Sequence, residues 1–96
     1  MTYAPKVILQ LPLSDAADLA GFVEKCLTDQ VSLISISGPG CAEIEDEIDW
    51  LIVGDGSDEA RHVTTAAHPN ECLADVIEFA ENWRVEGRSG VELVKL

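Results

Sequence analysis

The sequence predicts an α/β fold, a single-domain three-layer sandwich with a mostly parallel sheet of about four or five strands spanning residues 1–96. Two observations carry this prediction. Two apolar, β-branched segments flank an amphipathic segment within about thirty residues, which is the pattern of a βαβ unit. Strand-like and helix-like segments then keep alternating, and 96 residues suffice for one core. The expected element order is β-α-β-α-β-β-α-β.

The first βαβ unit begins with Lys6–Leu11, a short apolar segment stopped by Pro12 that is typical of a buried strand. Ser14 stands where an N-cap would stand, and apolar residues recur at helical spacing from Asp15 to Asp29. Val31–Ile36 then predicts a second strand ending in a Gly-Pro-Gly turn. Because such crossovers join parallel strands, we expect the two strands to be parallel neighbours.

The segment Cys41–Val53 fits two interpretations. Ile44 and Ile48 have helical spacing, whereas the run Trp50–Val53 before a Gly-Asp-Gly turn is typical of a buried strand. We expect a short acidic helix over residues 41–47 and a strand over residues 48–53. That strand would bury Trp50, and the alternative is that Trp50 anchors an interface.

The C-terminal part predicts a strand, a helix and a final strand. His62–Ala66 is rich in β-branched residues. A helix should begin after His68 with Pro69 as its first residue, because proline suits that position, and should end at Gly87. Val91–Leu96 alternates as a final strand.

Charge is the strongest feature of the composition. The formal net charge is −12, and the run from Glu43 to Glu59 contains eight carboxylates and no basic residue. Like charge disfavours nucleic acid and anionic membranes as partners and leaves a basic protein as the open class. The residues expected at such an interface are Glu43, Glu45, Asp46, Glu47, Trp50, Asp55, Asp58 and Glu59.

Location is predicted from what the chain lacks. The N-terminal segment has no long apolar stretch of the secretory type, and no apolar run approaches the roughly 18 residues that span a bilayer. An odd number of cysteines at irregular spacings argues against a disulfide framework. We therefore expect a cytoplasmic protein, similar in general form to the short acidic α/β proteins of bacteria.

Two further sites are candidates. The turn after the second predicted strand could hold a ligand at Gly38, Gly40 and Cys41, because ligands bind at the carboxyl ends of parallel strands. The turn lacks the third glycine of a dinucleotide fingerprint and the lysine of a P-loop. His62, His68 and Cys72 could bind a divalent metal. No cofactor is expected.

These patterns leave several functions open. We expect a binding or regulatory module without enzymatic activity that docks a basic partner through its acidic surface. The alternatives are a small ligand-binding domain or enzyme using the turn Ser37–Cys41, and a divalent-metal protein. A homodimer through an edge strand, such as the one ending at Leu96, is a further alternative.

Overall fold

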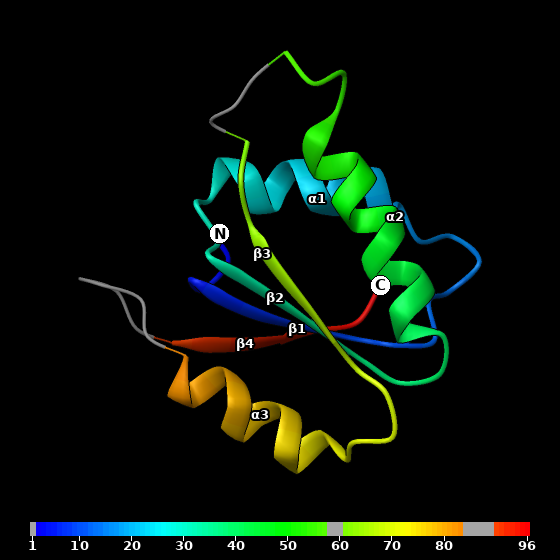
Figure 1. The fold of residues 1–96 in the computed structure, drawn as a ribbon, viewed down its shortest axis with the longest axis vertical. Coiled ribbons are helices and arrows are strands. Elements are labelled where there is room, and N and C mark those ends of the chain that lie inside the picture. The colour runs from blue at the N-terminus through cyan, green and yellow to red at the C-terminus, as the bar shows by residue number, and fades with distance from the viewer. Residues whose placement is uncertain (1, 58–60, 84–89) are drawn as a thin grey trace.

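The computed structural model describes residues 2–57, 61–83 and 90–96 and shows helices on both faces of one sheet (Figure 1). The strands are β1 (Lys6–Gln10), β2 (Leu33–Ser37), β3 (Thr64–His68) and β4 (Val91–Val94), and the helices are α1 (Leu19–Thr28), α2 (Cys41–Val53) and α3 (Leu73–Asn82). The strand order is β3-β2-β1-β4, and every pair is parallel. The predicted α/β sandwich with a parallel sheet is confirmed, including the parallel pairing of β1 with β2.

The core lies on both sides of the sheet because side chains alternate along each strand. Val7 and Leu9 of β1 pack toward α1 and α2, whereas Ile8 packs toward α3. Val76 and Ala80 of α3 complete the second cluster. The central strands β1 and β2 are therefore buried on both faces, as expected for parallel strands.

The strand expected over residues 48–53 is wrong, because α2 is one continuous helix from Cys41 to Val53. A spacing of four residues puts Ile44, Ile48 and Ile52 on one face, where they pack against the core. The Trp50 side chain points the other way and is 76% exposed, so its expected burial is wrong as well. The described part of the chain therefore contains four strands in the order β-α-β-α-β-α-β.

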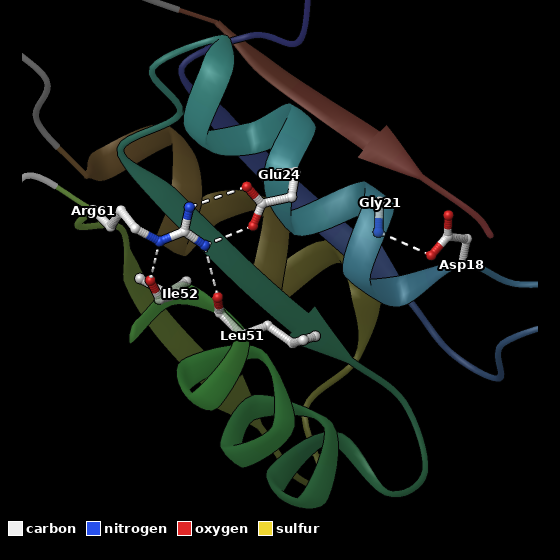
Figure 2. A network of polar contacts seen from close by, with 6 residues as sticks. All are labelled: Asp18, Gly21, Glu24, Leu51, Ile52 and Arg61. Carbon is white, nitrogen blue, oxygen red and sulfur yellow. Dashed lines mark hydrogen bonds and ion pairs between the residues drawn. The ribbon is translucent and has the colours of Figure 1, made fainter. Parts of the chain in front are cut away.

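Two helix starts also differ from the sequence prediction. The N-cap of α1 is Asp18 rather than Ser14, because the Asp18 carboxylate accepts a hydrogen bond of 2.9 Å from the Gly21 amide (Figure 2). Helix α3 begins at Leu73 rather than at Pro69, since β3 extends through His68. Gly87, where α3 was expected to end, lies outside the described residues.

Arg61 fixes the C-terminal end of α2 (Figure 2). Its Nε donates to the Ile52 carbonyl at 2.8 Å, and an Nη donates to the Leu51 carbonyl at 2.9 Å. The same guanidinium donates two hydrogen bonds to the Glu24 carboxylate of α1. The last carbonyls of a helix have no partner within the helix, so one side chain both caps α2 and ties it to α1.

Candidate functional site

The outward face of α2 combines exposed apolar and acidic side chains. Because one side of this helix packs on the sheet, the residues between the buried positions point to solvent. We define the α2 surface as the exposed residues Glu43, Asp46, Glu47, Trp50 and Val53. Trp50 is 76% exposed and Val53 is 49% exposed. The surface thus places two apolar side chains among three carboxylates.

An exposed indole offers apolar surface that a partner can bury. Tryptophan buries a large area when it is packed, and exposed tryptophans at the centre of a polar rim are the usual anchors of protein interfaces. Trp50 has Asp46 four residues before it and Glu47 three residues before it, so both carboxylates neighbour the ring on the helix surface. This arrangement suits a partner with basic and apolar side chains.

Carboxylates dominate the charge of α2, and the Arg61 guanidinium lies at its C-terminal end. The helix carries five carboxylates and no lysine or arginine. Lys6 is buried and donates to carbonyls at the C-terminal end of α3, Lys25 pairs with Asp29 at 2.7 Å, and Arg61 pairs with Glu24. Within the residues that the structure describes, no ion pair involves a carboxylate of α2. Negative potential therefore concentrates around Trp50.

The remaining carboxylates of the acidic run lie in different settings. Glu45 is half-buried, and Asp49 accepts a hydrogen bond of 2.7 Å from the Thr65 hydroxyl. Asp55 lies in the turn after α2, where hydrogen bonds from the Ser57 hydroxyl and amide lower the pKa of its carboxyl. The last two candidates, Asp58 and Glu59, lie outside the described residues.

A second feature is a pocket of about 500 Å³ at the carboxyl ends of β2 and β3. Its lining residues are Gly38–Glu43 and His68–Glu71, and we call it the His68 pocket. The structure thus brings the predicted ligand residues of the Gly38–Cys41 turn together with one of the predicted metal ligands. Two carboxylates, Glu43 and Glu71, also line it, so the pocket repels anions.

His68 itself is 5% exposed and forms a T-shaped pair with the Phe79 ring, at 4.7 Å between ring centroids. Its Nδ1 shares a hydrogen bond of 3.2 Å with the Glu71 carboxylate. Its Nε2 is enclosed and has no hydrogen-bond partner among the described residues. Among the described residues, no hydrogen bond joins the imidazole to a serine or cysteine, so this geometry does not define a nucleophile with its base.

A row of polar side chains on the α3 side of the sheet was not predicted from the sequence. Gln10, Ser37 and His68 are register partners at the carboxyl ends of three adjacent strands. Ser35, two residues before Ser37, faces the same side and is fully buried. The alternation of serine with isoleucine in β2 was the available signal. It marked one polar and one apolar face of this strand.

The three candidate metal ligands are not brought together. His62 precedes β3 and lines a separate pocket near the amino ends of the strands, whereas His68 ends β3. Cys72 is exposed at the N-cap of α3. Among the described residues, no group of three or more histidine, cysteine, aspartate or glutamate side chains could hold a metal ion.

The fold and the α2 surface define a small acidic α/β domain with an exposed tryptophan on its acidic helix. Residues 7–94 match the family described as a domain of unknown function (DUF7684), and the chain belongs to that family. Comparisons with curated proteins and with solved structures gave no match. In the described segments, no helix is both long enough and apolar enough to cross a membrane.

Proposed function

We propose that this chain is a docking module without enzymatic activity, which binds a basic segment of another protein through the α2 surface. The single observation that carries the proposal is Trp50, exposed at the centre of an acidic helix. Arginine and lysine side chains are attracted both to carboxylates and to the face of an indole ring, so one partner chemistry satisfies both features. We place this activity in the cytoplasm, where the three free cysteines would stay reduced.

The carboxylates and Trp50 would contribute in different ways. The charges accelerate encounter with a basic partner, and salt weakens that effect. Burial of the indole slows dissociation, since anchors of this kind contribute about 2 kcal/mol or more. Docking should therefore depend on salt mainly through association and on Trp50 mainly through dissociation.

The test is a titration of a fluorescein-labelled basic peptide, followed by fluorescence anisotropy. We expect Trp50→Ala to weaken binding at least tenfold, and about 2 kcal/mol corresponds to roughly thirtyfold. The double variant D46N/E47Q should weaken binding and reduce its salt dependence. The matched control E78Q/E81Q removes the same charge from exposed positions of α3, on the other face of the sheet.

The control decides between docking and general attraction. The charges on α3 lie across the sheet from α2, and salt screens exposed charges over a Debye length of about 8 Å at physiological ionic strength. E78Q/E81Q should therefore change the affinity by less than threefold, in line with screening. Equal losses in the two double variants, together with full binding by Trp50→Ala, would show non-specific attraction and contradict the proposal.

A further inference from the structure

Strand β3 is an edge of the sheet with free pairing capacity. Its one neighbour is β2, and no other strand of the described chain pairs with it. The Thr64 amide donates to the Ser32 carbonyl at 3.1 Å, so Thr64 points its backbone groups toward β2. Backbone groups alternate in direction along a strand, and those of Thr65 and Ala67 therefore point away from the sheet. Figure 1 shows this edge beside α2.

The β3 edge lacks the usual protection against pairing. Edge strands are commonly blocked by charged side chains, proline or a bulge. The strand reads Thr-Thr-Ala-Ala-His and contains none of these. The opposite edge, β4, carries Glu92, whose carboxylate accepts a hydrogen bond from the Ala4 amide. Of the two edges, β3 is the one open to an added strand.

The acidic helix packs on the face of the sheet next to this edge. The Thr65 hydroxyl donates to the Asp49 carboxylate at 2.7 Å. Asp49 of α2 therefore lies beside a residue whose backbone groups face the open edge. The half-buried carboxylate Glu45 lies one helical turn away, on the same side of α2. On the other face of the sheet, α3 packs against β1, β2 and β4 and leaves Ala66 half-exposed. The two faces beside the edge thus differ in charge.

We propose that β3 receives an extended segment of the basic partner as a fifth strand, with arginine or lysine at every second position facing α2. The segment would place small or apolar side chains on the opposite face, beside Thr64 and Ala66. This inference rests on the proposed docking function and specifies how the partner binds.

Charge decides against a second copy of the chain as the occupant. Pairing of two β3 edges would place two α2 helices side by side, each with five carboxylates and no basic residue. Like charges at close range oppose such a contact, and each chain carries a formal charge of −12. A strand with arginine or lysine side chains would instead be attracted to the carboxylates of α2.

The test uses two peptides of equal composition and amide hydrogen exchange measured by NMR. One peptide alternates arginine and valine over six residues, and the other has three arginines followed by three valines. Both carry the same charge, but only the first puts all its arginines on one face of a strand. At a free peptide concentration of about ten times the Kd, an amide bonded only in the complex should exchange about tenfold more slowly.

We expect the alternating peptide to slow exchange at Thr65 and Ala67 about tenfold, and the block peptide to leave both amides unprotected. Binding of either peptide without protection at these two amides would overturn the added strand and leave docking on α2 intact. If neither peptide binds, the proposed function fails as well. Protection that rises with protein concentration without peptide would identify a second copy as the occupant and overturn the inference.

Discussion

Replacing Arg61 by alanine should destabilise the fold by about 2 to 3 kcal/mol. The change removes two charge-assisted hydrogen bonds to the carbonyls of Ile52 and Leu51, at 2.8 and 2.9 Å (Figure 2). Such bonds contribute about 1.5 kcal/mol each at the lower end of their range, which applies because the Arg61 side chain is 23% exposed. The ion pair with Glu24 adds little, since that carboxylate is more than half exposed.

Urea unfolding followed by circular dichroism measures the loss. With a slope near 1 kcal/mol per molar urea, the midpoint should fall by about 2 to 3 M. Arg61→Lys keeps the charge but cannot reach both carbonyls in the same geometry, so we expect about half of that loss. Glu24→Gln isolates the ion pair and should cost much less than Arg61→Ala. A change below about 0.5 kcal/mol in Arg61→Ala, or an equal loss in Glu24→Gln, would refute the capping role.

Three further predictions concern exposure and ionisation. Trp50→Ala should change the free energy of unfolding by less than about 0.5 kcal/mol in urea titrations, because its side chain is 76% exposed; a larger loss would mean that Trp50 supports the fold. Iodoacetamide at pH 8 should modify exposed Cys72 in the folded protein and spare Cys26, because burial raises the pKa of the Cys26 thiol to about 12. Mass spectrometry of digested peptides would contradict this if Cys26 reacted as fast. The hydrogen bond from Lys25 lowers the pKa of the Asp29 carboxyl, so its stabilising effect is present above the unfolded pKa of about 3.9 and is lost as the pH falls through the folded value. Acid unfolding of Asp29→Asn should therefore depend less steeply on pH than that of the wild type, and identical profiles would contradict the assignment.

The two central strands could be predicted because they carry no charged residue over residues 7–10 and 33–37. The segment around Val7 is apolar on both sides, and the segment around Ile34 carries only two small serines beside Leu33 on its second side, so both are typical of buried parallel strands. The helix between them has a clear stripe of apolar residues. Its start was misplaced because Ser14 and Asp18 are both good caps, and only the packing of the chain selects Asp18.

Residues 48–53 show where local pattern fails. Four large apolar residues in succession resemble a strand, yet a helix of this sequence buries Ile48 and Ile52 and leaves Trp50 in water. The sequence does not reveal that other segments supply the four described strands of the sheet. Residues 48–53 therefore belong to the helix that covers the α1 face of that sheet. The exposure of Trp50, which carries the proposed function, is a consequence of that tertiary choice.

Tertiary structure also decided which of the candidate site residues could be predicted to lie together. The acidic character of α2 is visible in the sequence, and so is the turn at Gly38. The meeting of that turn with His68, and the separation of His62 from His68, depend on strand order. A strand of five residues places its two ends well over 10 Å apart, which spacing along the chain does not reveal.

The most direct test of docking on α2 is an NMR titration of the folded protein with the alternating arginine–valine peptide. We expect amide shifts to concentrate at α2 around Trp50 and along β3, and Trp50→Ala to weaken the binding at least tenfold. Shifts of equal size at the exposed carboxylates of α3, unchanged by Trp50→Ala, would contradict docking on α2.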